Sequence, residues 1–77
     1  MKELLTFILE GITGKKDFKI EETEEGGRVD YLIFAPEEMV GMIIGKNGKT
    51  IKAIRNLLKV RATLEKKAVS VSVSPKT

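Results

Sequence analysis

The chain has 77 residues, of which 42% are hydrophobic and 32% charged, and its formal net charge is +3. This length allows one small domain, and the composition is typical of globular rather than disordered proteins. The absence of cysteine and histidine excludes disulfides, thiol nucleophiles and the commonest transition-metal ligands. We therefore expect no metal site and no cofactor.

No segment has the features of a membrane anchor or a secretion signal. No apolar run approaches the roughly 20 residues that a membrane-spanning helix needs. The start of the chain carries Glu3 and lacks a small-residue cleavage site, unlike a signal peptide. We expect a cytoplasmic protein without a membrane partner.

Residues 2–12 are predicted to form an amphipathic helix, because their apolar residues recur at helical spacing. The segment Gly11-Ile12-Thr13-Gly14 follows the pattern G-x-x-G and is followed by two lysines. A strand-like segment comes next, however, and a strand has no free helix N-terminus to hold a phosphate. We interpret both glycines of this first G-x-x-G as the end of the helix.

Two strands joined by a hairpin are predicted next. Residues 18–24 begin in alternation and indicate a half-buried strand, and Glu25-Gly26-Gly27 has the composition of a tight turn. Residues 28–35 end in an uninterrupted apolar run. Such a run favours a central strand that is buried on both faces.

The remaining residues predict two helices and an edge strand. Pro36 opens a short helix to Ile44, and a longer helix runs from the following glycine turn to about Thr63. Valines alternating with serines over 69–73 indicate an edge strand, and residues 75–77 are expected to form a flexible tail.

The order helix–strand–strand–helix–helix–strand predicts an α+β fold in one domain over residues 1–77. The two helices between the second and third strands are long enough to allow parallel pairing of those strands. We therefore expect a three-stranded mixed sheet with residues 28–35 in the middle. All three helices should pack on one face of that sheet.

The turn Gly45-Lys46-Asn47-Gly48 is the candidate functional site. Its glycines allow a sugar-phosphate backbone to approach closely, and the free N–H groups of a helix start attract anions. A helix start normally favours acidic residues, yet Lys46, Lys49 and Lys52 crowd this one. Because this placement is unfavourable unless an anion binds, it indicates a functional site.

The distribution of charge supports this interpretation. Residues 1–40 contain five Lys and Arg against ten Asp and Glu, a net charge of −5. Residues 41–77 contain nine against one, a net charge of +8. Excess positive charge attracts polyanions, although a charge run alone is more often a solvated surface. Here it coincides with the glycine turn.

The segment Val40-Gly41-Met42-Ile43-Ile44-Gly45-Lys46-Asn47-Gly48-Lys49-Thr50-Ile51 closely resembles the signature of K-homology (KH) domains, a family of small RNA-binding modules. The element order is similar to the type II, prokaryotic form of that fold, and nearly the entire chain is covered. The chain thus resembles the KhpA-like single-domain proteins of bacteria. The resemblance implies a single KH domain, low RNA sequence specificity and a role as RNA chaperone or regulator. It also implies a homodimer, or a heterodimer with a larger KH-containing protein.

The resemblance assigns roles to ten residues. Gly45, Lys46, Asn47 and Gly48 would clamp the backbone of about four nucleotides of single-stranded RNA. An apolar groove for the bases would include Gly41, Ile44 and Ile51. Further phosphate contacts would come from Lys49, Lys52 and Arg55.

Simpler interpretations of some residues stay open. Ile44 and Ile51 fit a plain core role equally well, and Gly41 would also suit a close approach of two helices. Asn56 and Lys59 are interpreted as ordinary solvated residues. None of the four aromatic residues lies near the turn, so bases would rest on aliphatic side chains and be poorly distinguished.

Two other classes of function compete with RNA binding. A KH fold without RNA contact would act as a protein-interaction adaptor through its acidic half or its sheet face. An enzyme is disfavoured, because the serines at 70, 72 and 74 have no candidate base and the Walker-type G-x-x-x-x-G-K-[ST] spacing is absent.

Overall fold

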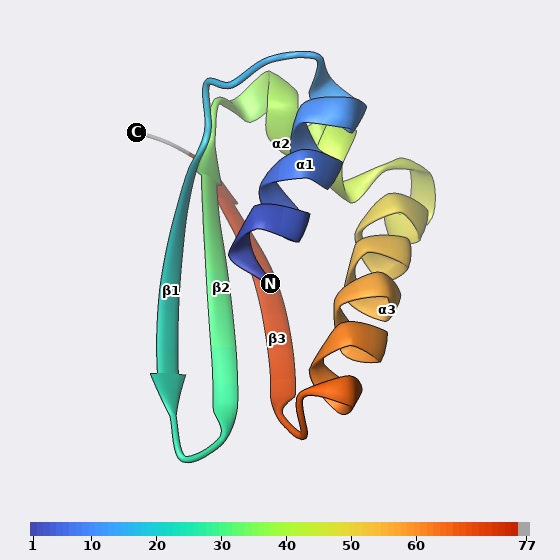
Figure 1. Ribbon diagram of the computed structural model, residues 1–77. Coiled ribbons are helices and arrows are strands. Elements are labelled where there is room, and N and C mark those ends of the chain that lie inside the picture. Colours follow the sequence, from blue (N-terminus) through green and yellow to red (C-terminus); the bar gives the residue numbers. More distant parts are fainter. Residues whose placement is uncertain (76–77) are drawn as a thin grey trace.

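The computed structural model describes residues 1–75, and its elements follow the predicted order (Figure 1). They are α1 (Lys2–Thr13), β1 (Lys19–Glu25), β2 (Arg28–Ala35), α2 (Glu37–Ile44), the 3-10 turn η1 (Lys46–Gly48), α3 (Lys49–Leu64) and β3 (Ala68–Pro75). Strand β3 thus includes Pro75, the first residue of the expected tail. The other two residues of that tail, 76 and 77, lie outside the described part. Within residues 1–75, no helix combines the length and hydropathy needed to cross a bilayer.

The three strands form one mixed sheet in the order β1-β2-β3. Strands β1 and β2 are antiparallel and are joined by Gly26 and Gly27, whose φ angles of 58° and 80° suit a tight two-residue turn. Strand β3 pairs with β2 in parallel, from Arg28 opposite Ala68 to Ala35 opposite Pro75. The helices lie on one face of the sheet (Figure 1). The predicted α+β topology is confirmed, and it is consistent with a type II KH fold.

The core lies between the sheet and the helices. Every second residue of β2 is buried against the helices, whereas the residues between them are half-buried or exposed. The prediction that β2 is buried on both faces is therefore wrong. Leu32 and Phe34 are only partly covered, because no helix lies on their face and their neighbours in β3 are Ser72 and Ser74. The largest fully buried side chains are Leu5, Leu9, Val29, Ile33, Ile43, Ile54 and Leu58.

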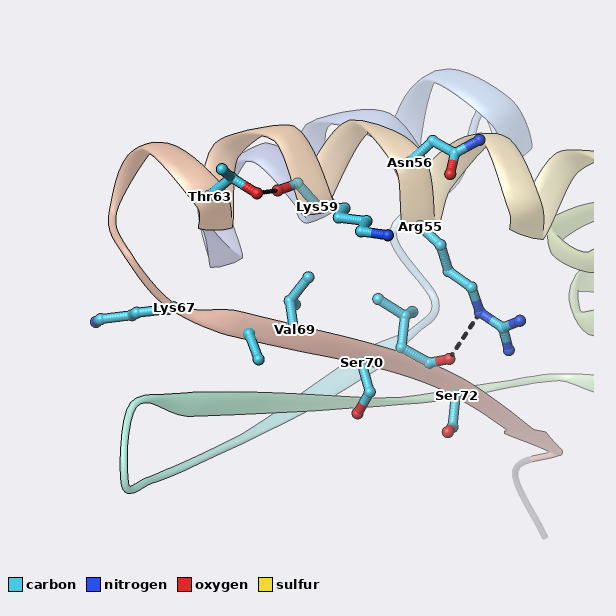
Figure 2. A pocket seen from close by; sticks show the side chains of 10 residues that line it. Arg55, Asn56, Lys59, Thr63, Lys67, Val69, Ser70 and Ser72 are labelled. Atoms are coloured by element: carbon cyan, nitrogen blue, oxygen red, sulfur yellow. Dashed lines mark hydrogen bonds between the residues drawn. The ribbon is translucent and has the colours of Figure 1, made fainter.

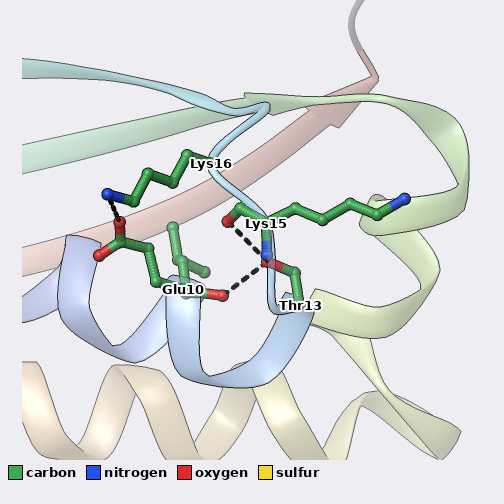
Figure 3. Close-up of polar contacts among 5 residues, drawn as sticks. Glu10, Thr13, Lys15 and Lys16 are labelled. Carbon is green, nitrogen blue, oxygen red and sulfur yellow. Dashed lines mark hydrogen bonds and ion pairs between the residues drawn. The ribbon is translucent and has the colours of Figure 1, made fainter.

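The first G-x-x-G ends helix α1, as predicted. Gly14 adopts a left-handed conformation (φ 69°), and its N–H donates to the Glu10 carbonyl at 2.8 Å. The Thr13 hydroxyl donates to the Leu9 carbonyl and accepts from the N–H of Lys15 (Figure 3). Gly11, in contrast, lies inside the helix. The chain then runs to β1 without starting another helix, so this copy of the motif cannot offer a helix N-terminus.

Candidate nucleic-acid interface

The second G-x-x-G connects two helices, as the sequence predicts. Helix α2 ends at Ile44, and α3 begins at Lys49, directly after Gly48. Three of the four loop residues have positive φ angles: 74° at Gly45, 58° at Asn47 and 73° at Gly48. Such angles favour glycine and are tolerated by asparagine, so the local sequence itself selects this sharp turn.

The backbone N–H groups of the turn are less available than expected. The Gly45 N–H donates to the Gly41 carbonyl at 2.9 Å, and the Gly48 N–H donates to the Gly45 carbonyl at 3.2 Å. The Lys49 N–H donates to the Lys46 carbonyl. The expectation of free N–H groups is therefore wrong at these three positions. The bond of Gly45 closes the last turn of α2, and those of Gly48 and Lys49 belong to the 3-10 turn. These three N–H groups are therefore not available to an anion.

The side chains around the turn project into solvent. Lys46, Asn47, Lys49 and Lys52 are all exposed, and no ion pair or hydrogen bond engages their side chains within residues 1–75. Lysine side chains that lack an internal partner at a helix start are free to bind an external anion. The structure thus brings together the predicted phosphate contacts of the loop and of the first turn of α3.

The three residues predicted to hold bases fall into two groups. Ile51 is only 8% exposed and belongs to the hydrophobic core, as the simpler interpretation held. Ile44 is 38% exposed, and Gly41 is exposed on the same side of α2. A β-carbon at Gly41 would meet no atom within 4 Å, so the idea that Gly41 lets two helices approach closely is wrong. Gly41 and Ile44 lie on an open surface beside the turn.

A groove of about 530 Å³ lies between α3 and the edge strand β3. Among the ten predicted site residues, only Arg55 lines it. Figure 2 shows Lys59 and Arg55 extending from α3 over β3, with Lys67 at the start of the strand. The groove is lined by Arg55, Asn56, Lys59 and Thr63 of α3 and by residues 67–72.

The sequence interpretation missed this groove. Asn56 and Lys59 are exposed, as predicted, but they also line the groove and continue the polar side of α3 that begins at Lys52. That helical spacing is the signal that was visible in the sequence. The missing information was that β3 lies beside this side of α3, which depends on contacts between distant segments.

The cations of the groove differ in their partners. The Lys67 ammonium forms an ion pair with Glu24 of β1 at 3.1 Å, which compensates its charge. The Nε–H of Arg55 donates to the Val71 carbonyl at 3.3 Å. The Lys59 ammonium has no ion-pair or hydrogen-bond partner within residues 1–75. Lys59 and the outer end of Arg55 therefore remain available to a ligand.

Comparison with known proteins identifies the family. A family model described as "KhpA/KhpB, KH domain" matches residues 2–73. A protein of Thermotoga maritima named "RNA-binding protein KhpA" is 46% identical over 59 residues, which cover 75% of this chain and 79% of the relative. Proteins of the same name from Caldanaerobacter subterraneus and Chlamydia trachomatis are 38% and 34% identical, covering 95% of this chain and 99% and 95% of the relatives. No solved structure gives a significant match. With its G-x-x-G turn between two helices and its mixed sheet, the chain belongs to the KhpA/KhpB family of KH domains.

Proposed function

We propose that this protein binds single-stranded RNA without catalysing a reaction on it. The relatives bear the name RNA-binding protein. The observation that carries the proposal is the exposed turn at Gly45–Gly48, where Lys46 and Asn47 lack partners within residues 1–75 and α3 begins immediately afterwards. Phosphates of about four nucleotides would be held by these two side chains together with Lys49 and Lys52.

We propose that the RNA continues from the turn along α3. Arg55 lies six residues after Lys49, which corresponds to about 9 Å along a helix. The chain of nucleotides would thus pass from the turn into the groove between α3 and β3. Bases would rest on aliphatic side chains such as Ile44, so binding would be weak and little dependent on sequence. Such binding would suit an RNA chaperone or a post-transcriptional regulator.

The test is a double substitution with a matched control. Lys46→Asp with Asn47→Asp should lower the affinity for an eight-nucleotide uridine RNA about tenfold or more, because two donors become two like charges. The control, Lys15→Asp with Lys16→Gln, lowers the net charge by the same three units beside the first G-x-x-G. We expect it to alter the affinity by less than about threefold. Equal effects of the two double variants would refute binding at the second turn.

We also propose that two copies pair through α3. Ala53, Leu57, Val60 and Leu64 lie on the side of α3 that faces away from the core, and Leu57, Val60 and Leu64 are 55%, 63% and 76% exposed. Their spacing of four, three and four residues is the pattern by which one helix packs against another. A second copy of α3 supplies the same stripe, so the surface is self-complementary about a two-fold axis.

An antiparallel arrangement of the two helices fits the charges. Parallel packing would place the three lysines of each helix start against those of the other copy, whereas antiparallel packing separates them. A two-fold axis perpendicular to antiparallel helices also leaves the polar sides of both helices on the same side of the dimer. Two RNA-binding surfaces joined in this way would bind a longer RNA more tightly than one.

The same apolar stripe is the observation that favours a protein partner. A larger KH-containing protein that presents a similar helix would compete with the second copy, and an adaptor without RNA affinity would use the same surface. The adaptor alternative does not account for the crowded, unpaired lysines at the start of α3. The adaptor alternative would be favoured if Lys46→Asp with Asn47→Asp left the RNA affinity unaltered and the protein still paired through α3.

A further inference from the structure

Strand β1 is an edge of the sheet, and its outer side pairs with no other strand of the described chain. The sheet order is β1-β2-β3, and Figure 1 shows β1 on the side away from α3. Because a two-glycine turn joins β1 to β2, the flanking residues Glu25 and Arg28 form the hydrogen-bonded pair that closes the hairpin. The alternation of the ladder then directs the N–H and C=O groups of Ile20, Glu22 and Glu24 away from β2.

The geometry of β1 does not close this edge. Sheet edges are commonly protected by short strands, prolines or bulges. Strand β1 has seven residues and no proline, and its register with β2 is continuous from Lys19 opposite Phe34 to Glu25 opposite Arg28. All of its residues except Ile20 are exposed. The outward backbone groups are therefore open to another extended chain that adds a strand to the sheet.

The side chains of β1 determine which charge such a chain must carry. The strand contains one lysine and four glutamates, a net charge of −3. Glu24 is paired with Lys67 at 3.1 Å, and Glu21 lies 4.0 Å from the lysine of the strand itself. Glu22 and Glu25 have no ion-pair partner within residues 1–75. The edge thus combines unpaired backbone groups with uncompensated negative charge.

We propose that the outer edge of β1 binds an extended, lysine- or arginine-rich segment of a partner protein, which adds a strand to the three-stranded sheet. Backbone hydrogen bonds to Ile20, Glu22 and Glu24 hold the segment, and its cationic side chains lie against the glutamates. The same charges disfavour two other occupants. A second copy of β1 places glutamates against glutamates, and RNA phosphates are repelled. The proposal does not depend on RNA binding at the Gly45–Gly48 turn.

The first experiment measures the binding of three labelled eight-residue peptides by fluorescence anisotropy, with no RNA present. One peptide alternates lysine and valine, the second has the same sequence with every backbone amide N-methylated, and the third alternates glutamate and valine. The first peptide should bind about tenfold more tightly than either of the others, because it alone combines backbone donors with positive charge. No binding of the first peptide, or equal affinity for its N-methylated form, would overturn the addition of a strand.

Two variants of Glu22 separate the backbone from the charge. Glu22→Pro and Glu22→Gln remove the same negative charge, but only proline removes the N–H that faces the free edge. We expect Glu22→Gln to weaken binding of the lysine–valine peptide about twofold and Glu22→Pro about tenfold. Equal affinities of the two variants would refute the backbone contact.

Two further measurements keep the test decisive. Circular dichroism and urea unfolding establish whether Glu22→Pro is folded, and if it is not, the N-methylated peptide still tests the backbone bonds. In the wild-type protein, the bound lysine–valine peptide should protect the amide protons of Ile20, Glu22 and Glu24 from hydrogen exchange, as measured by NMR. Binding without this protection would place the peptide elsewhere and overturn the proposal, while RNA binding at the turn would stand.

Discussion

Gly45 lies so close to Thr50 that a β-carbon at residue 45 would come within 2.7 Å of the Thr50 Cβ. Gly48 has no such neighbour, since a β-carbon there would meet only the Ile51 Cγ2 at 4.0 Å. Both residues have positive φ angles, 74° and 73°. Residue 45 must therefore be glycine for two reasons: Thr50 leaves no room for a side chain, and the φ angle is positive. At residue 48 only the positive φ angle favours glycine.

This difference predicts a graded series of alanine variants. Gly45→Ala should lower the free energy of unfolding by about 2 kcal/mol or more, because the start of α3 must shift. Gly48→Ala should cost about 1 kcal/mol for the left-handed conformation. Gly41→Ala, inside α2 with open space around it, should be neutral or stabilising by up to about 1 kcal/mol. Urea unfolding measures the stability of all three variants. An equal loss of unfolding free energy in Gly45→Ala and Gly41→Ala would contradict the close contact of Gly45 with Thr50.

The salt dependence of RNA affinity should report how many phosphates the protein neutralises. With about four phosphates neutralised, the logarithm of affinity should fall with the logarithm of salt concentration at a slope of roughly −3. Lys52→Ala should reduce the magnitude of that slope by about 0.7, the share of one phosphate. The control is Lys16→Ala, since Lys16 is paired with Glu10 at 3.6 Å and lies beside the first G-x-x-G. Equal slopes for Lys52→Ala and wild type would remove Lys52 from the interface.

The oligomeric state should depend on the apolar stripe of α3. Leu57→Gln with Val60→Gln should shift the protein to a monomer in sedimentation equilibrium, because the centre of the stripe becomes polar. Phe7→Gln is the control, since Phe7 on α1 is 74% exposed but lies on another helix. A dimer that persists in the double variant, or a wild-type protein that is monomeric at high concentration, would rule out pairing through this face.

The stability of the fold should respond to acid through Asp30. A hydrogen bond from the Ser70 hydroxyl, followed by one from Arg28 at 3.1 Å, lowers the pKa of Asp30 below its ordinary value of 3.8. A carboxyl with a lowered pKa stabilises the fold above its ordinary pKa and loses this contribution as the pH falls through the folded value. The urea midpoint of the wild-type protein should therefore drop below pH 4, and Asp30→Asn should flatten that drop. If the urea midpoints of the wild-type protein and Asp30→Asn fall equally with pH, protonation of Asp30 is not the cause of the drop.

Much of the fold was predictable because its determinants are local. Gly14 ends α1 and Gly26-Gly27 forms a tight turn, and both depend on the φ angles that glycine tolerates. The burial of β2 was not predictable in the same way. An apolar run such as Tyr31 to Ala35 has the same pattern whether one or both faces are covered, and only the position of the helices distinguishes the two cases.

By itself, the sequence determined the turn at Gly45–Gly48, the lysines around it and the helix that follows, because these depend on neighbours within a few residues. The element order also predicted parallel pairing of β3 with β2, but only the tertiary structure decided the register of that pairing and placed β3 beside the polar side of α3. That pairing brings Val71 to Arg55, leaves Ile51 in the core and forms the groove. These contacts join residues that are distant in the chain, and the periodicity of a single helix or strand carries no information about which other element will face it.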